Sequence, residues 1–404
     1  MLCSPASVLP SPPSSCPPNQ ITDWNLIIVP GNPGLPGFYQ SYVEALAPRL
    51  AAQQEGPHGA RWRISVVGLR GHVSHVTRKR VGWARWLRGS VEHFGLAAQE
   101  DHIADYVYQD ANRHVADHLD GLIDDPATAA GGLLPGEPGP RWPPRRRERT
   151  VVVGHSIGAY LGLEALRRHP DRVHAFLGIM PFLESSAHCS REYRRLDLVM
   201  TWLWPVLYLC GAVAEAASRL MPPKLQAKLL AGHTANMDQK VGNFTVRAML
   251  SFGVVCNYLW LGKTEFDNHV RRFDFEKRLT PDAGGGPRAG PLARKVHLLY
   301  TPLDFWGPLE GRARAEQAGI ATSVLGPTGL QARDDGSPVA EPPPLQQARQ
   351  EEPAAAAAAA AGGEVGGRFV PHAFGVTREA SERVAEWTAR HLAAVVLAAA
   401  NGGD

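Results

Sequence analysis

One decapeptide in the middle of the chain limits the possible folds more than any other feature. It reads Val151-Val152-Val153-Gly154-His155-Ser156-Ile157-Gly158-Ala159-Tyr160 and contains the pattern G-x-S-x-G. A β-branched run precedes the pattern and a helical run follows it, so the serine is expected on a tight turn between a strand and a helix. The two glycines omit side chains that would collide with neighbouring backbone. Ser156 is therefore predicted to be a nucleophile at a helix N-terminus, where developing negative charge is favoured; the alternative is a purely structural turn.

Strands and helices are expected to alternate along the chain. Short apolar runs without polar alternation suit strands that are buried on both faces of a parallel sheet. These runs are Leu26–Val29, Ile64–Val67, Val151–Val153, Ala175–Met180 and Val296–Tyr300. Helical patterns cover Tyr39–Ala52 and Ala159–His169, and a last helix begins after Thr377 as its N-cap. This order predicts a mostly parallel α/β sheet with helices on both faces.

Low-complexity stretches divide the sequence. Residues 1–23 form a tail rich in proline and serine, and two inserts cover about 124–149 and about 327–367. Such compositions bury little apolar surface and do not predict regular structure. We therefore expect one domain over about 24–400, interrupted by these two inserts.

Charge and cysteine content exclude some classes of protein. The 42 basic and 39 acidic residues leave a net charge of +3, too small and too scattered to indicate a nucleic-acid partner. The five cysteines are odd in number and show no zinc or dithiol spacing, which favours a reducing, intracellular compartment. The N-terminus has no secretory signal pattern. We expect no metal and no organic cofactor, and the oligomeric state stays open.

A serine nucleophile needs a histidine to take its proton and a carboxylate to orient that histidine, and the chain order in such folds is serine, acid, histidine. Asp304 stands just beyond the run Val296–Tyr300 and is the predicted acid. The competing acids precede that strand: Asp267, Asp274 and Asp282.

His372 is the predicted base because it lies on a loop just before the last helix. Without the second insert, the distance in sequence from Asp304 to His372 leaves room for one helix and one strand. The other histidines are less well placed: His155 in the turn, His297 in a strand, His391 in the last helix, and His72 and His75 in an early loop. Together these positions predict an α/β-hydrolase fold.

An oxyanion hole requires two backbone N–H donors. Ile157, the residue after the nucleophile, should supply the first. The second should come from Pro30-Gly31-Asn32-Pro33-Gly34, which follows an early strand. Pro33 has no N–H, so the donor is Asn32 or Gly31, and we choose Asn32. The alternative is that this segment is an ordinary turn with no role in an oxyanion hole.

Three motifs together resemble the lipid droplet-associated hydrolase family: Pro-Gly-Asn-Pro-Gly with Phe38-Tyr39, Gly-His-Ser-Ile-Gly-Ala-Tyr, and Pro-His-Ala-Phe. The similarity extends from about Asn25 to the last helix without the inserts, and includes the stretch Asn257–Phe266. It implies the roles given above for Ser156, Asp304 and His372. It also implies hydrolysis of neutral-lipid esters, such as sterol esters, at lipid droplets and the endoplasmic reticulum.

An uncharged run, LVMTWLWPVLYLCGAVA, covers Leu198–Ala214 inside a segment at about 196–222. Its roughly seventeen residues fall short of the roughly twenty that span a bilayer, and Pro205 would kink a helix. A buried apolar cap and a hairpin in one lipid leaflet are both compatible with the residues. The resemblance favours the hairpin, because a droplet is bounded by a single monolayer.

We therefore expect an enzyme that cleaves carboxylic esters of neutral lipids, sterol esters or acylglycerols, on a droplet monolayer, with a possible endoplasmic-reticulum or cytosolic pool. Two alternatives remain. An acyltransferase would use the same acyl-enzyme, with an alcohol in place of water. A droplet-binding protein with little turnover would need no active triad.

Overall fold

The computed structural model describes most of the core of the 404-residue chain. The continuous ranges are 22–55, 59–69, 95–110, 149–183, 221–249, 252–268, 290–302, 309–326, 329–330 and 370–401. The shorter pieces are residues 198, 202, 203, 206, 209, 210, 213, 216, 217, 220, 273–275, 279, 304 and 306.

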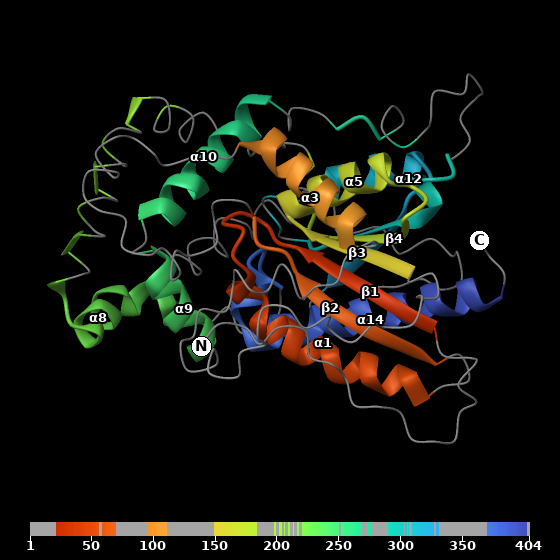
Figure 1. Ribbon diagram of the computed structural model, residues 1–404, viewed down its shortest axis with the longest axis horizontal. Coiled ribbons are helices and arrows are strands. Elements are labelled where there is room, and N and C mark those ends of the chain that lie inside the picture. Colours follow the sequence, from red (N-terminus) through yellow and green to blue (C-terminus); the bar gives the residue numbers. More distant parts are fainter. Residues whose placement is uncertain are drawn as a thin grey trace, which may run out of the picture.

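A single sheet forms the centre of the molecule (Figure 1). Its strand order is β2-β1-β3-β4-β5-β6-β7. The first six strands pair in parallel, and only β6 with β7 is antiparallel. The strands are β1 (Thr22–Val29), β2 (Ala60–Val66), β3 (Arg149–His155), β4 (Val173–Ile179), β5 (Val296–Tyr300), β6 (Ala321–Gly326) and β7 (Gly329–Leu330).

Helices cover both faces of this sheet, as the alternation of elements predicts. Helices α1 (Gln40–Ala52) and α14 (Arg378–Ala400) pack on one face, and α3 (Leu96–Asp110), α5 (Ile157–Arg168) and α12 (Leu309–Gln317) lie on the other (Figure 1). Side chains along β1 alternate between two cores: Ile27 packs on the α5 side, and Leu26 and Ile28 pack on the α1 side. The parallel, doubly covered sheet confirms the predicted fold class.

Helices α8 (Pro223–Thr234), α9 (Gln239–Met249) and α10 (Phe252–Asn268) lie beyond the carboxyl ends of the strands, at the left of Figure 1. Contacts from α9 and α10 attach these helices to the segment that follows β1. A Cβ on Gly37 would meet the ring of Phe244 on α9 at 2.6 Å, and the Asn32 side-chain amide donates to the Tyr258 carbonyl on α10 at 3.1 Å.

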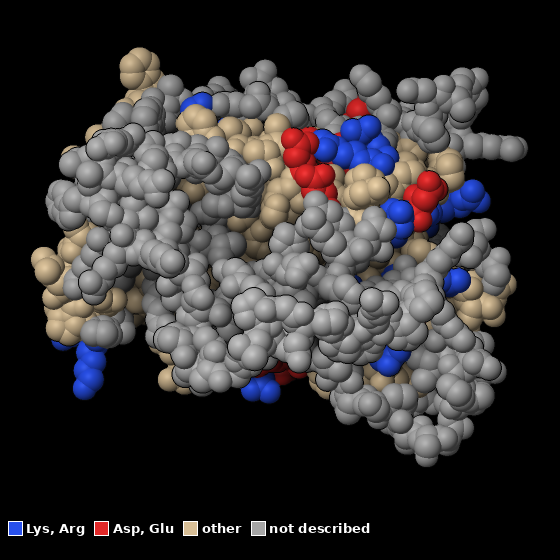
Figure 2. Space-filling view, viewed as in Figure 1, with Lys and Arg blue, Asp and Glu red and all other residues tan. Residues whose placement is uncertain are grey.

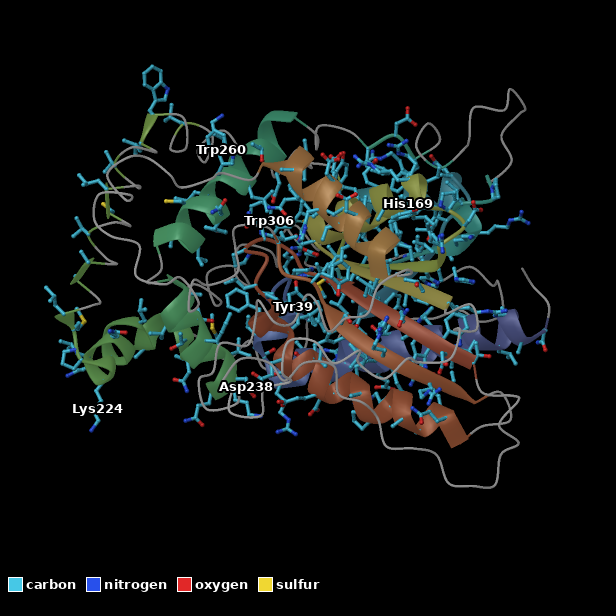
Figure 3. The ribbon with its side chains drawn as sticks, viewed as in Figure 1. Tyr39, His169, Lys224, Asp238, Trp260 and Trp306 are labelled. Atoms are coloured by element: carbon cyan, nitrogen blue, oxygen red, sulfur yellow. The ribbon has the colours of Figure 1, made fainter. Side chains whose placement is uncertain are left out.

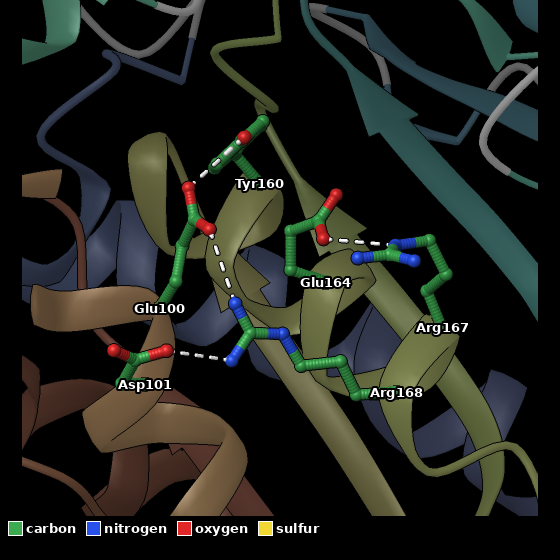
Figure 4. A network of polar contacts seen from close by, with 6 residues as sticks. All are labelled: Glu100, Asp101, Tyr160, Glu164, Arg167 and Arg168. Carbon is green, nitrogen blue, oxygen red and sulfur yellow. Dashed lines mark hydrogen bonds and ion pairs between the residues drawn. The ribbon is translucent and has the colours of Figure 1, made fainter. Parts of the chain in front are cut away.

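A polar network fastens α3 to α5 (Figure 4). The Tyr160 hydroxyl donates to Glu100 at 3.1 Å, and Arg168 pairs with Asp101 at 2.7 Å and with Glu100 at 3.3 Å. Figure 2 shows charged side chains of both signs gathered over α3, α5 and α12. Exposed pairs of this kind contribute little to stability individually, typically below about 1 kcal/mol. The network links α3 to the helix that follows Ser156, whose buried residues Ile157–Leu166 hold it in the core.

The predicted boundaries need small corrections. Strand β1 begins at Thr22, so the last two residues of the expected tail belong to the sheet. Arg149, assigned to the first insert, begins β3, and the two-residue strand β7 falls inside the second insert. The other residues of both inserts and of the tail lie outside the described residues, as do His72, His75 and Asp282.

The segment at about 196–222 differs from a buried cap wherever the structure describes it. The described large apolar side chains between Leu198 and Leu220 are exposed, with Trp202 74% and Leu209 65% accessible. The other exposed members are Leu198, Leu203, Val206, Val213 and Leu220. The described residues therefore do not show a packed apolar cap, and none of the helices among them has the length and apolarity needed to cross a membrane.

Candidate active site

Ser156 occupies a strained turn between β3 and α5. Its φ of 54° and ψ of −125° lie where non-glycine residues rarely occur, a conformation that costs on the order of 1–3 kcal/mol. Gly154 and Gly158 permit the turn, because a Cβ at Gly158 would lie 2.3 Å from the Val29 carbonyl oxygen. The Ser156 carbonyl accepts the backbone N–H of Phe182 at 3.1 Å. This surrounding structure holds the serine where the sequence predicts it.

The structure brings Ser156, His372 and Asp304 together. His372 Nε2 lies 2.8 Å from Ser156 Oγ, and His372 Nδ1 lies 2.8 and 2.9 Å from the two oxygens of Asp304. The carboxylate can only accept, so Nδ1 carries a proton and Nε2 is free to accept the serine proton. Residues 216 and 68 positions apart in sequence thus form one chain of hydrogen bonds.

Burial and a backbone donor fix the Asp304 carboxylate. Its side chain is fully buried, whereas the His372 side chain is 20% exposed. Asp304 follows β5, and Oδ1 also accepts the backbone N–H of Trp306 at 2.9 Å. An oriented buried carboxylate beside an accessible imidazole suits a base that must exchange protons with substrate.

Two of the competing histidines lie elsewhere. His297, on β5, contacts Ser323 at 2.9 Å and packs edge to face on His391 with ring centroids 4.1 Å apart. Burial, followed by the nearby His391, lowers the pKa of His297 to about 3. Asp274, a competitor for the acid, is exposed, and the side chain of Asp267 lies outside the described residues.

His155 lies beside His372 but is bonded differently. Its Nε2 is 2.8 Å from the His372 carbonyl oxygen, and its Nδ1 is 2.5 Å from the Tyr39 hydroxyl. Burial, followed by the nearby His372, holds the pKa of His155 well below its usual value. Neither ring nitrogen contacts Ser156 Oγ.

The loop Pro30–Gly34 lies directly on Ser156, since a Cβ built on Gly31 would meet the serine Cβ at 2.8 Å. The Gly31 N–H donates to the Tyr39 hydroxyl at 2.8 Å and is therefore occupied. No hydrogen bond joins the Asn32 backbone N–H to another described residue. Ile157 is the first residue of α5, so its N–H has no partner within the helix.

Two buried side chains near this loop have no assigned role in the sequence prediction. Tyr39, at the centre of Figure 3, belongs to the motif Phe38-Tyr39 and is 4% exposed. Glu265, on α10, is 5% exposed, and burial raises its pKa to about 8 despite the nearby Asn32 amide. In the sequence, Tyr39 stands out only as part of the family motif Phe38-Tyr39. Glu265 stands out only as part of the similar stretch Asn257–Phe266.

Among the described residues, no group of three or more His, Cys, Asp or Glu side chains is arranged to hold a metal ion. Of the cysteines that the structure describes, Cys210 is exposed and Cys256 is buried, and neither forms a disulfide.

Similar solved structures are distant in sequence. The thioesterase domain from the curacin biosynthetic pathway has 12% identity, a TM-score of 0.40, and coverage of 93% of this chain and 91% of that one. N-formylmaleamic acid deformylase from Pseudomonas putida S16 has 13% identity and a TM-score of 0.39, covering 75% and 84%. A thermophilic esterase from Thermogutta terrifontis has 14% identity and a TM-score of 0.35, covering 75% and 80%. No curated protein sequence matches the chain.

The family described as lipid-droplet associated hydrolase matches residues 23–119 and 143–321, more than half of the chain. These ranges include Ser156 and Asp304 and end before His372. The match agrees with the parallel sheet and with the strand-to-helix turn at Ser156. This protein therefore belongs to the lipid-droplet associated hydrolase family and is an enzyme of the α/β-hydrolase type.

Proposed function

We propose that this enzyme cleaves carboxylic esters of neutral lipids, sterol esters or acylglycerols, through a triad of Ser156, His372 and Asp304. The observation that carries the proposal is the unbroken chain of hydrogen bonds from the serine hydroxyl through the imidazole to the buried carboxylate. Each group stands in the order and geometry that acyl transfer requires.

The reaction follows from this geometry. As Ser156 Oγ attacks the ester carbonyl, its proton moves to His372 Nε2, and Asp304 stabilises the resulting imidazolium. The imidazolium then protonates the leaving alcohol. A water molecule that His372 deprotonates next attacks the acyl-enzyme and releases the acid. The backbone N–H groups of Ile157 and Asn32 bind the oxyanion, because Gly31 already donates to Tyr39.

Two aromatic residues near the triad are consistent with a substrate that has an apolar acyl group. The rings of Phe182 and Trp306 pack edge to face, with their centroids 5.6 Å apart. The Phe182 N–H donates to the Ser156 carbonyl and the Trp306 N–H to Asp304, so both residues adjoin the reacting groups. Phe182 is buried in the core and Trp306 is partly exposed, so of the two rings Trp306 is the one available to an apolar substrate near the triad.

A panel of sterol esters, acylglycerols and short acyl esters tests the substrate class. The purified enzyme should hydrolyse lipid esters, and Ser156→Ala should lower the rate on the order of 10³-fold or more. Adding an alcohol acceptor separates hydrolysis from acyl transfer, because a transferase would form a new ester in place of free acid. Full activity in a folded Ser156→Ala variant would contradict the triad.

The exposed apolar residues of 198–220 are the proposed attachment to the droplet monolayer. Each large apolar side chain contributes roughly 1.5–3 kcal/mol when it leaves water, so a few are sufficient for stable residence. Changing Trp202, Leu203 and Leu209 to glutamate should release a labelled protein from droplets into the cytosol. Neutralising the basic residues 145–147 should have a smaller effect, since each surface charge contributes only about 1 kcal/mol. A folded glutamate variant that stays on droplets would contradict this role.

A further inference from the structure

A second chain of hydrogen bonds links the loop that carries the proposed oxyanion donor to the loop that carries His372. The Gly31 backbone N–H lies 2.8 Å from the Tyr39 hydroxyl, which lies 2.5 Å from His155 Nδ1. His155 Nε2 lies 2.8 Å from the His372 carbonyl oxygen. The chain therefore joins three segments that meet at Ser156: the loop after β1, the turn after β3 and the loop before α14.

The chemistry of the partners determines the direction of every bond. The His372 carbonyl can only accept, so His155 Nε2 must carry a hydrogen. In a neutral ring Nδ1 then accepts, so the Tyr39 hydroxyl donates to it and uses a lone pair to accept the Gly31 N–H. Every group is satisfied in this one arrangement. A second proton on His155 would make Nδ1 a donor and deprive the Tyr39 hydroxyl hydrogen of its acceptor.

We propose that Tyr39 and His155 are positioning residues for the triad, an inference that rests on the proposed function. By holding Gly31, the pair fixes Asn32, whose N–H must point at the developing oxyanion. By holding the His372 carbonyl, it fixes the imidazole that reaches Ser156. His155 also stays uncharged beside His372, with ring centroids 4.9 Å apart, when His372 becomes positively charged during the reaction.

The chain offers a matched control for this role. Tyr39 and Tyr42 are both buried, and both pack edge to face on Phe374, with ring centroids 6.0 and 5.3 Å away. The Tyr42 hydroxyl also makes a buried hydrogen bond, to Thr388 at 2.9 Å, and Thr388 belongs neither to the triad nor to the chain through Gly31 and His155. Removing either hydroxyl deletes one buried group, and only one of the two reaches the triad.

The test compares Tyr39→Phe with Tyr42→Phe on a substrate that the wild type hydrolyses. Tyr39→Phe should lower kcat on the order of 10- to 100-fold with little change in KM, and should slow fluorophosphonate labelling of Ser156 by a similar factor. Tyr42→Phe should lose comparable thermal stability yet keep kcat within about twofold. Combining Tyr39→Phe with His155→Gln should cost no more than the worse single change, because both break one chain.

Two results would overturn the inference: wild-type kcat in a folded Tyr39→Phe variant, or additive losses in the double variant. If Tyr39→Phe does not fold, ¹⁵N NMR of histidine in the wild type decides instead. The His155 signal, assigned by its loss in His155→Gln, should show a neutral ring protonated at Nε2, and protonation at Nδ1 would refute the chain. Loss of activity in Ser156→Ala alongside a fully active Tyr39→Phe would refute only the positioning role, whereas an active Ser156→Ala would refute the proposed function itself.

Discussion

Replacing Glu265 with glutamine should remove a loss of stability that this buried carboxyl imposes on the fold as pH rises. Glu265 is 5% exposed on α10, and its Oε1 has no hydrogen-bond partner among the described residues. Burial disfavours the charged form and raises the pKa to about 8, against an ordinary value of 4.5. The folded protein therefore keeps a proton here that the unfolded chain releases.

The sign follows from this difference in bound protons. Between pH 4.5 and pH 8 the folded state binds more protons than the unfolded state, so the free energy of unfolding falls as pH rises through this window. One pKa unit corresponds to about 1.4 kcal/mol, so this carboxyl should lower the free energy of unfolding by roughly 4 kcal/mol between pH 5 and pH 9. Well below pH 4.5 the carboxyl is neutral in both states and contributes no pH dependence.

Denaturant unfolding at pH 5, 7 and 9, followed by tryptophan fluorescence, measures this contribution. Glu265→Gln keeps the shape of the side chain without an ionisable group, so the stability of the variant relative to wild type should rise by several kcal/mol from pH 5 to pH 9. Glu382→Gln, an exposed carboxyl paired with Arg378, is the control and should change little. A difference between wild type and Glu265→Gln that stays constant across this range would refute the reasoning from burial.

Two further perturbations test the fold. Gly158→Ala should prevent folding or abolish the turn, because its Cβ would lie 2.3 Å from the Val29 carbonyl oxygen. In Gly232→Ala, within α8, the added Cβ meets nothing within 4 Å, so this change should be neutral or stabilising by up to about 1 kcal/mol. Thermal unfolding distinguishes the two, and equal melting temperatures would contradict the packing at the turn. Deleting 125–147, or 331–366 so that β7 is kept, should leave a folded protein with its activity. Loss of the helical circular dichroism signal in either deletion would show that the deleted residues belong to the core.

Local patterns in the sequence were sufficient for the strands that contain a run of apolar residues. The run Val296–Tyr300 coincides with β5, and the run Val151–Val153 lies inside β3. Strand β6 (Ala321–Gly326) is missed as a named run because its first half, Ala-Thr-Ser, is polar or small and partly exposed. Only the length between Asp304 and His372 predicted that one helix and one strand lie there, and α12 and β6 occupy that place.

The rule of chain order gathered Ser156, Asp304 and His372 because parallel strands bring their carboxyl ends to one edge of the sheet. No residue pattern supports the preference for Asn32 over Gly31 as the proposed oxyanion donor, because the bond from Gly31 to Tyr39 that supports it is a tertiary contact. The bond between Tyr39 and His155 joins residues 116 positions apart, and no periodicity encodes such a contact. Burial of Glu265 likewise depends on how α10 packs against the loop at Asn32.

The most direct test of the central claim is covalent labelling of the intact protein with a fluorophosphonate, followed by mass spectrometry of the whole chain and of its peptides. An activated serine should give one adduct, on the peptide that contains Ser156, and Ser156→Ala should give none. His372→Ala should label far more slowly, because the serine would lack the base that lies 2.8 Å away. A folded wild-type protein that takes up no label, or an adduct that persists in Ser156→Ala, would contradict the account.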